Sequence, residues 1–482
     1  MTTFYVQNFG CRATQADGAA IERQFRDRGM EPADGPSAAA VVVLNTCTVT
    51  ASADQDARAA IRRVHRENPG CQIVVTGCYA QRAPEEIAGL PGVSQVIGNS
   101  HKHQVANLAI KSSNFVPLTH LGTENRELKT EIYISDIFAH TELLAAPVFD
   151  AVGGARTRPN LKVQDGCDNR CSFCVIPYVR GQSRSLPLPE ILRELRALVD
   201  AGYREVVISG INLGRWGRDL PEFVWSGRPR AGRFENLVRA ILDQTSLEKL
   251  RISSVEPMDW SDELIRLVAE SPRIAKHAHV PLQSGSDRIL RRMHRKYRPW
   301  HYREKIEKIR AAMPTAAIGA DVMVGFPGET DVDFEETRRL IEDLPFTYLH
   351  VFTYSSRPGT PAAAMLNQVP VQLARERNRI LRVLAAEKKQ AFMQGFVGKT
   401  LDAITLSASS KRLSSRAKSV DSLANLHGEV EGSAFVDDDC TEALTDNYLN
   451  LRLKGSYEPN HWMKAIIERA EEGGLTGAAQ TT

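Results

Sequence analysis

The sequence predicts an α/β protein in three parts: an N-terminal α/β parallel-sheet domain, a central partial (β/α)6 barrel and a small C-terminal β-barrel. Three observations lead to this prediction. β-rich segments alternate with amphipathic helical segments over residues 1–100, and the same alternation resumes over about residues 158–390. From about Val397 the pattern changes to short strands separated by polar breaks. Strand–helix alternation is typical of parallel sheets covered by helices, and short consecutive strands are typical of small barrels.

The first part supplies four predicted strands with helices between them. The strands are Phe4–Asn8, Ala40–Asn45, Gln72–Thr76 and Ser94–Ile97, and the clearest helical patterns are Ala16–Arg28 and Ser52–Glu67. We assign residues 1–105 to this domain. Residues 106–157 have weak periodicity and one predicted strand, Glu131–Ile134, and we interpret them as a connector.

The central part, residues 158–392, contains six predicted βα units. Its strands are Asn160–Val163, Glu205–Ser209, Lys249–Ser253, His277–Pro281, Ala317–Val324 and Tyr348–Thr353. Helical patterns between them include Pro189–Asp200, Arg233–Gln244, Ser286–Met293 and Asp331–Glu342. Such a series predicts a complete or partial barrel with its functional residues at the carboxyl ends of the strands.

The last part, residues 393–470, is predicted as a small barrel or sandwich, a class that often binds oligonucleotides. Its predicted strands are Leu401–Leu406, Gly428–Val436 and Tyr448–Leu453. The tail, residues 471–482, is small and polar, and we expect it to be disordered.

Composition narrows the function classes. Hydrophobic residues make up 42% and charged residues 25% of the chain, the balance of a globular protein. The N-terminus has no basic segment followed by an apolar one, and the longest apolar run falls far short of the ~20 residues that cross a bilayer. We therefore expect a cytoplasmic protein without a membrane partner. The net charge of +3 does not by itself indicate nucleic acid.

Three of the eight cysteines form a C-x₃-C-x₂-C loop after the first barrel strand: Cys167, Cys171 and Cys174. Three thiolates on one loop can hold a 4Fe–4S cluster and leave one iron without a protein ligand. S-adenosylmethionine (SAM) can chelate such an iron through its amine and carboxylate, and an electron from the cluster then cleaves its sulfonium. The alternative is a structural zinc site, but a fourth ligand at finger-like spacing is missing. The spacing resembles that of the radical SAM superfamily.

Three further cysteines occupy equivalent places in the first domain. Cys11, Cys47 and Cys78 each follow the carboxyl end of a predicted strand, the edge where open α/β sheets bind ligands. Cys71 lies at the entering end of its strand and is interpreted as a small hydrophobic residue. Cys440, within DDDC, is interpreted as a surface or edge residue.

Taken together, these features resemble the radical SAM methylthiotransferase family over nearly the whole chain. The matching stretches are NFGCRATQ, NTCTVT and TGCYAQ around the N-terminal cysteines, VQDGCDNRCSFC in the barrel, and GEVEGSAFV and LTDNYLNLRLKG in the last part. The resemblance implies a second 4Fe–4S cluster on Cys11, Cys47 and Cys78, which holds the sulfur to be delivered, and a terminal RNA-binding TRAM-like barrel. The alternative is three buried packing cysteines. Family members commonly have Asn where this chain has Thr14, which we interpret as tuning, since a hydroxyl also hydrogen-bonds.

Polar and small residues at the other strand ends resemble the family's SAM pocket. They are Gly210, Asn212, Ser254, Glu256, Gln283 and Gly325. Glycine allows the backbone to approach a ligand, and the polar side chains can bind the amine or ribose of SAM. Each of them alone is as typical of a helix cap or turn.

The family divides by substrate: a ribosomal-protein aspartate, isopentenyladenosine in tRNA, or threonylcarbamoyladenosine in tRNA. NTCTVTASAD, VVTGCYAQ and FTYSSRPGTPAA are most similar to the group that acts on threonylcarbamoyladenosine. Because that substrate carries a carboxylate, Arg357 in the last stretch is our candidate for binding it, the alternative being a surface arginine in a turn. Methylthiolation of isopentenyladenosine remains the second hypothesis.

The resemblance also implies partners. These are the anticodon loop of tRNA, a reductant such as flavodoxin or ferredoxin, and a sulfur donor. Three basic runs suit tRNA phosphates, although each alone is also typical of a solvated surface: Arg58, Arg62, Arg63 and Arg66; Arg291, Arg292, Arg295, Lys296 and Arg298; and Lys411, Arg412, Arg416 and Lys418. A non-catalytic iron–sulfur protein that binds RNA is the alternative of a different class. The open iron argues against it, since electron carriers usually ligate every iron with protein.

Overall fold

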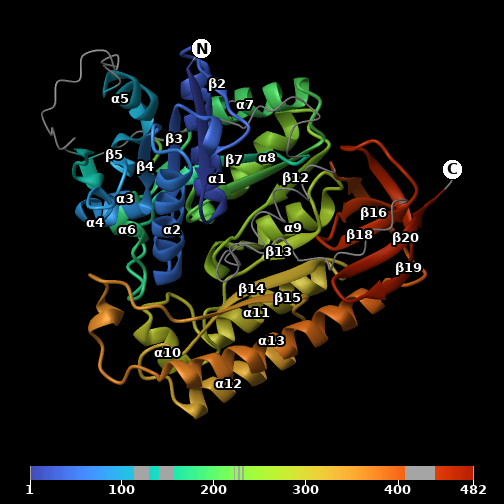
Figure 1. Cartoon of the computed structure of the whole chain (residues 1–482). Coiled ribbons are helices and arrows are strands. Elements are labelled where there is room, and N and C mark those ends of the chain that lie inside the picture. The colour runs from blue at the N-terminus through green and yellow to red at the C-terminus, as the bar shows by residue number, and fades with distance from the viewer. Residues whose placement is uncertain are drawn as a thin grey trace, which may run out of the picture.

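The computed structural model describes residues 2–112, 130–139, 157–221, 223–225, 228–230, 233–407 and 440–480. It confirms the predicted fold class. Figure 1 shows the N-terminal sheet in blue, the central strands in green to yellow, and the C-terminal barrel in red at the far end of the long orange helix α13 (Val371–Gln394).

The N-terminal domain is a six-stranded parallel sheet in the order β2-β1-β3-β4-β5-β6. Its strands are β1 (Thr3–Asn8), β2 (Glu31–Pro32), β3 (Val41–Thr46), β4 (Gln72–Gly77), β5 (Val93–Gly98) and β6 (Glu131–Tyr133). Its helices are α1 (Arg12–Arg26), α2 (Ala51–Glu67), α3 (Cys78–Arg82), α4 (Pro84–Ala88) and α5 (Val105–Ser112). One apolar cluster joins α2 to the sheet and another joins α1 and α5 to it, so helices cover both faces.

β6 confirms the strand predicted in the connector and changes the domain boundary. It pairs in parallel with β5, with Val96 opposite Ile132. Residues 131–133 therefore complete the N-terminal sheet, and the domain does not end at residue 105.

The central domain confirms the six predicted βα units. Its parallel strands are β7 (Asn160–Asp165), β9 (Glu205–Gly210), β12 (Lys249–Ile252), β13 (His277–His279), β14 (Ala317–Val324) and β15 (Tyr348–Thr353). They form the sheets β7-β9-β12 and β13-β14-β15, which a bridge between Leu250 and Ile274 links into a partial barrel. A short strand β8 (Arg184–Ser185) runs antiparallel to β7, and β10 (Phe223–Trp225) pairs with β11 (Arg228–Arg230).

Helices surround the central strands. Besides α13 they are α6 (Ile176–Arg180), α7 (Leu188–Asp200), α8 (Phe234–Gln244), α9 (Asp262–Glu270), α10 (Asp287–Arg292), α11 (Pro299–Ala312) and α12 (Asp331–Asp343). Alternation along the strands separates two faces: Ala320 and Val322 of β14 pack into the helix-covered core, whereas Asp321 between them faces the lumen. β14 therefore presents a carboxylate to the lumen.

The C-terminal domain is a closed barrel in the order β16-β17-β18-β20-β19. Its strands are β16 (Thr400–Thr405), β17 (Cys440–Thr445), β18 (Asn450–Lys454), β19 (Trp462–Glu471) and β20 (Gly474–Ala479). The predicted strand Gly428–Val436 lies outside the described residues. Cys440 is exposed at the start of β17, which agrees with its interpretation as a surface residue; β17 is not an edge strand, because it pairs with both β16 and β18.

The prediction of a disordered tail from residue 471 is wrong. β20 pairs with both β18 and β19 and closes the barrel. Its small residues permit close approach, because a Cβ on Gly477 would lie 2.3 Å from the carbonyl oxygen of Ile466, and Leu475 is buried. The small residues that suggested disorder are therefore the ones that fit the close packing of a small barrel.

The C-terminal barrel covers the entering ends of the central strands. Asn460 donates to the carbonyl of Gly202, before β9, and Asn447 donates to that of Thr315, before β14. The N-terminal domain lies beside β7, where Asn160 donates to the carbonyl of Arg12, and extends to the carboxyl ends, where Arg357 beyond β15 pairs with Asp54. In the described part of the chain, no helix is both long and apolar enough to span a membrane.

Candidate functional site

The cysteines of the central domain lie on a loop held by its own backbone. Cys167 follows β7, its amide donates to the carbonyl of Gly181, and the amide of Cys174 donates to that of Cys171. Gly166 has a φ of +70°, and a Cβ there would lie 1.9 Å from the carbonyl oxygen of Gln182. Glycine is therefore required where the chain leaves the strand and turns into the loop.

Neighbouring side chains donate hydrogen bonds to two of these thiols. Asn212 Nδ2 lies 3.6 Å from Cys167 Sγ, and Arg295 donates to Cys171 Sγ at 3.3 Å. Arg295 also pairs with Glu256. Burial raises the pKa of Cys174 and of Cys167, so these thiols favour the neutral form unless a cation replaces the proton. The donor set therefore fits a metal cluster bound through thiolates.

The N-terminal cysteines meet at one edge of their sheet. Cys11, Cys47 and Cys78 follow β1, β3 and β4, which are neighbours with Asn8 opposite Asn45 and Thr46 opposite Gly77. Burial, and then charge on the other two thiols, raises the pKa of Cys47 to about 12. A Cβ on Gly10 would lie 2.8 Å from Cys47 Sγ, so the backbone closely approaches this thiol. Three thiols gathered in this way fit a second cluster.

The two sets of cysteines lie on neighbouring elements. Cys78 packs against Val175 and Val179, in the segment that directly follows Cys174. Asn99 joins both sides, since its Nδ2 donates to Cys78 Sγ at 3.5 Å and to the carbonyl of Val179 at 2.7 Å. The cysteine edge of the N-terminal sheet therefore faces the cysteine loop of the barrel.

A buried network of charged side chains lies behind both sets. Arg180 donates to Asp17 at 3.0 Å and to Asp165 at 2.9 Å, Lys102 pairs with Asp17 at 2.9 Å, and Lys162 pairs with Asp165 at 2.8 Å. Burial would raise the pKa of Asp17, but the charges of Lys102, Lys162 and Arg180 hold it well below its usual value. The network joins α1, α6 and β7, which carry residues next to Cys11, Cys174 and Cys167.

Sequence reasoning did not identify this network. Asp165 and Arg180 lie within the same stretch as the central cysteines, and their nearness to Cys167 was the only available signal. Asp17 pairs with Lys162 across 145 positions, and local sequence carries no sign of that contact.

The residues expected to bind SAM divide into two groups. Two of them, near the carboxyl ends of β9 and β13, have a buried atom without a hydrogen-bond partner among the described residues: Asn212 Oδ1 and Gln283 Oε1. The same holds for Oγ of Ser209, the residue before Gly210. Such atoms fit a polar ligand. Glu256 is placed beside the cysteine loop through Arg295, and Ser254 hydrogen-bonds His279.

The two glycines serve packing. A Cβ on Gly210 would lie 2.8 Å from Gln164 Oε1, the atom that accepts from the amide of Asn212. A Cβ on Gly325 would lie 2.5 Å from the Cβ of Ala374 in α13. Gly210 thus positions Asn212, and Gly325 allows α13 to pack closely.

Arg357 has a different partner from the one that its sequence context indicated. Only 3% exposed, it forms an ion pair with Asp54 and donates to Thr48, the residue after Cys47. Arg82 donates to the same Asp54 at 2.8 Å. Arg357 is therefore a buried link between the barrel and the Cys47 loop rather than a surface arginine in a turn.

The basic runs have different outcomes. On α2, Arg62 and Arg66 are exposed, while Arg58 pairs with Glu86. The second run does not form one surface, because Arg295 is buried beside Cys171. The third run, from Lys411 to Lys418, lies outside the described residues.

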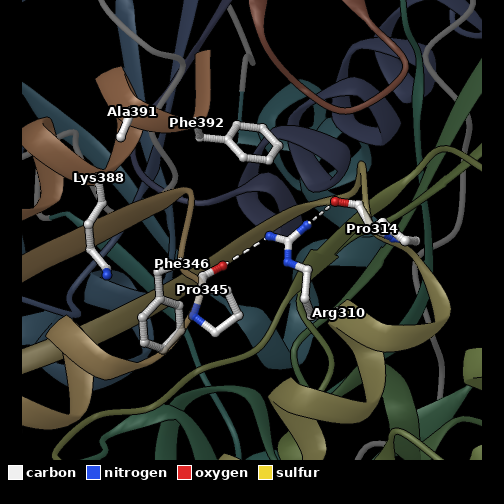
Figure 2. A pocket seen from close by; sticks show the side chains of 7 residues that line it. All are labelled: Arg310, Pro314, Pro345, Phe346, Lys388, Ala391 and Phe392. Atoms are coloured by element: carbon white, nitrogen blue, oxygen red, sulfur yellow. Dashed lines mark hydrogen bonds between the residues drawn. The ribbon is translucent and has the colours of Figure 1, made fainter. Parts of the chain in front are cut away.

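A pocket of about 300 Å³ lies away from all these cysteines (Figure 2). Arg310 of α11 crosses it and donates to the carbonyls of Pro314 and Pro345, and Phe392 of α13 closes one side. Since Pro314 and Pro345 precede β14 and β15, the pocket opens at the entering ends of the strands. It is therefore not part of the cysteine site.

Comparison with known proteins agrees with this geometry. Residues 161–341 match the model of the radical SAM superfamily, and residues 3–98 match the uncharacterized protein family UPF0004. The chain is similar to the radical SAM methyltransferase TsrM of Kitasatospora setae, a structure with cobalamin and a [4Fe–4S] cluster bound. The TM-score is 0.52 at 14% identity, with 75% of this chain and 77% of that chain covered. At that identity the likeness shows the fold alone.

Sequence relatives are more similar. The threonylcarbamoyladenosine tRNA methylthiotransferase MtaB of Bacillus subtilis is 36% identical over 84% of this chain and 85% of its own length. The MtaB of Aquifex aeolicus is 36% identical over 83% of this chain and 92% of its own length. The tRNA-2-methylthio-N(6)-dimethylallyladenosine synthase of Nocardia farcinica is 34% identical over 86% of this chain and 80% of its own length.

Proposed function

This chain belongs to the radical SAM methylthiotransferase family, whose chemistry uses SAM and a 4Fe–4S cluster, and we propose that it methylthiolates C2 of N6-threonylcarbamoyladenosine next to the anticodon of tRNA. The reaction uses two clusters and two molecules of SAM. Cys167, Cys171 and Cys174 hold one cluster, and Cys11, Cys47 and Cys78 hold the other. A cytoplasmic reductant such as flavodoxin or ferredoxin and a sulfur donor complete the system.

The observation that carries this proposal is the approach of two separate sets of three thiols. Cleavage of SAM alone needs only the barrel set. Here the second set faces the first, and Cys78 packs against the segment that follows Cys174. Delivery of a sulfur-bearing group to a base requires both centres within one cavity, and this arrangement supplies that proximity.

The chain's own residues position the reactants. Cys167, Cys171 and Cys174 would hold a cluster that, once reduced by the external reductant, would supply the electron for cleavage of SAM into methionine and a 5′-deoxyadenosyl fragment. Asn212 and Arg295 hold the thiolates of Cys167 and Cys171, and Glu256 fixes Arg295. The unpartnered atoms of Ser209, Asn212 and Gln283 are available to SAM.

The choice of substrate rests on two supports. Relatives named for threonylcarbamoyladenosine reach 36% identity, against 34% for those named for dimethylallyladenosine, which alone is a small difference. The lumen is polar, with His279, Asp321 and His350 on one wall. A polar wall suits the threonylcarbamoyl group, whereas an isopentenyl group needs an apolar slot.

The deciding experiment offers the anaerobically reconstituted enzyme one tRNA in three forms: with threonylcarbamoyladenosine, with isopentenyladenosine, and with unmodified adenosine. Mass spectrometry of the digested nucleosides measures the product. We expect methylthiolation of the threonylcarbamoylated form alone. Equal turnover of the unmodified form, or turnover of the isopentenylated form alone, contradicts the substrate assignment.

Matched cysteine variants test the two clusters. We expect about eight irons in the wild type and about four after replacement of either set of three cysteines by alanine. Alanine at Cys11, Cys47 and Cys78 should abolish product and retain SAM cleavage, whereas alanine at Cys167, Cys171 and Cys174 should abolish both. A wild type that saturates at about four irons contradicts the two-cluster assignment.

A further inference from the structure

One wall of the barrel lumen carries two imidazoles and a carboxylate. His279 ends β13, Asp321 lies in β14 and His350 lies in β15. The strands are neighbours, with Asp321 opposite His350 and His279 opposite Gly319, two residues before Asp321. Because side chains two residues apart share a face of a strand, all three residues project from the same face.

The donor atoms of this triad lie close together. One ligand atom from each residue lies within 4.8 Å of the other two. His279 Nε2 is 3.4 Å from Asp321 Oδ1, and within the described part of the chain it is buried and makes no hydrogen bond. That separation exceeds the usual N–H···O distance of about 2.7–3.2 Å. It equals the spacing of about 3.4 Å between two ligands that each lie about 2.1 Å from a tetrahedral metal ion.

The surroundings orient both rings. Ser254 Oγ is 2.6 Å from His279 Nδ1, which leaves Nε2 directed at Asp321. The rings of His279 and His350 are 5.5 Å apart, and Tyr348 packs against both. A hydrogen bond to the second ring nitrogen is what normally fixes a metal-binding histidine.

We propose that His279, Asp321 and His350 bind a divalent transition-metal ion inside the barrel, separate from the cysteine-bound clusters. Two imidazoles with one carboxylate are a ligand set suited to zinc or ferrous iron. Three protein ligands leave at least one coordination position open to water or to an oxygen of the substrate. This inference does not depend on which tRNA base is modified.

The test uses the full-length, cluster-loaded protein, treated with a chelator and dialysed anaerobically against Zn²⁺. Zinc and iron per chain are then measured by mass spectrometry. We expect the wild type to retain about one zinc that Asp321→Asn and His350→Gln lose, and Ser254→Ala to bind it at least about tenfold more weakly. The control His301→Gln alters an exposed histidine of α11 and should retain the zinc.

Zinc K-edge X-ray absorption of the wild type provides a readout that does not depend on the folding of any variant. Nitrogen and oxygen ligands including two imidazoles support the site. Sulfur ligation shows zinc on cysteines instead and overturns the proposal. The proposal is also overturned if Asp321→Asn or His350→Gln binds as much zinc as the wild type. This comparison requires that the variant match the wild type in iron content and melting temperature.

Discussion

Besides Lys102, whose charge also acts on Cys78, Arg180 carries the charge of the buried network to the N-terminal cysteines. It pairs with Asp17 and Asp165, and its charge acts on Cys78 and Cys11. With Lys102 and Lys162 the network holds three cations and two carboxylates, a formal charge of +1. A buried positive charge beside an iron–sulfur cluster favours its reduced, more negative state.

Arg180→Gln should therefore lower the reduction potential of the cluster proposed on Cys11, Cys47 and Cys78. A loss of roughly 1–2 kcal/mol of charge interaction corresponds to about 40–90 mV for one electron. The measurement is a redox titration followed by electron paramagnetic resonance, in protein whose barrel cysteines are alanine, so that one cluster contributes. Arg193→Gln, at an exposed position of α7, is the matched control, and an equal potential in both variants would show that Arg180 has no such effect.

Substitution of Arg357 distinguishes two roles: binding the substrate carboxylate, as its sequence context indicates, and pairing with the buried Asp54, as the structure shows. If the buried pair with Asp54 is its main role, Arg357→Ala should destabilise the protein by about 3–5 kcal/mol, because Asp54 loses one of its two guanidinium partners. A double-mutant cycle with Asp54→Asn should then show strong coupling in thermal unfolding. If the melting temperature is unchanged and the KM for threonylcarbamoylated tRNA rises, the result supports the sequence-based hypothesis that Arg357 binds the substrate carboxylate.

At the scale of elements, the sequence predicts which residues lie at strand ends, but it does not predict which side chains pair between domains. Cys11, Cys47 and Cys78 could be placed together because parallel strands bring their carboxyl ends to one edge. β13 ends at His279 instead of Pro281, and Gln283 beyond it has a φ of +65°. Pairs such as Asp17 with Lys162 depend on the docking of two domains, and no local pattern encodes them.

β20 provides a prediction at this scale. Leu475 is 1% exposed in a strand that we expected to be a disordered tail. Leu475→Ala should cost about 2–5 kcal/mol of local stability, because it opens a cavity in the small barrel. Hydrogen exchange of β18, β19 and β20 measures this locally, and Ile466→Ala, at an exposed position of β19, is the control. Unchanged exchange in Leu475→Ala would mean that β20 does not stabilise the barrel.

At the scale of the whole molecule, the C-terminal barrel touches both other domains. Tyr448 accepts a hydrogen bond from Arg12, the residue after Cys11, at 3.0 Å, and its ring lies 4.5 Å from that of His277. Arg251 of β12 donates to the carbonyls of Thr445 and Asp446. The barrel therefore closes the entering end of the lumen and is not attached by a linker alone.

This arrangement predicts what removal of the C-terminal barrel does. Deletion from Val397 onward uncovers Ala317, Tyr348 and His277, which pack against or beside Tyr448, and leaves the buried Arg251 without its backbone acceptors in the barrel. We expect the truncated protein to melt at lower temperature and to lose SAM cleavage even without tRNA, in addition to binding tRNA more weakly. Tyr448→Phe, which removes only the hydroxyl contact with Arg12, should retain the melting temperature within a few degrees. If the truncated protein melts and cleaves SAM like the full chain while failing to bind tRNA, the barrel is an independent RNA-binding module, and its contacts with the other two domains do not support the catalytic site.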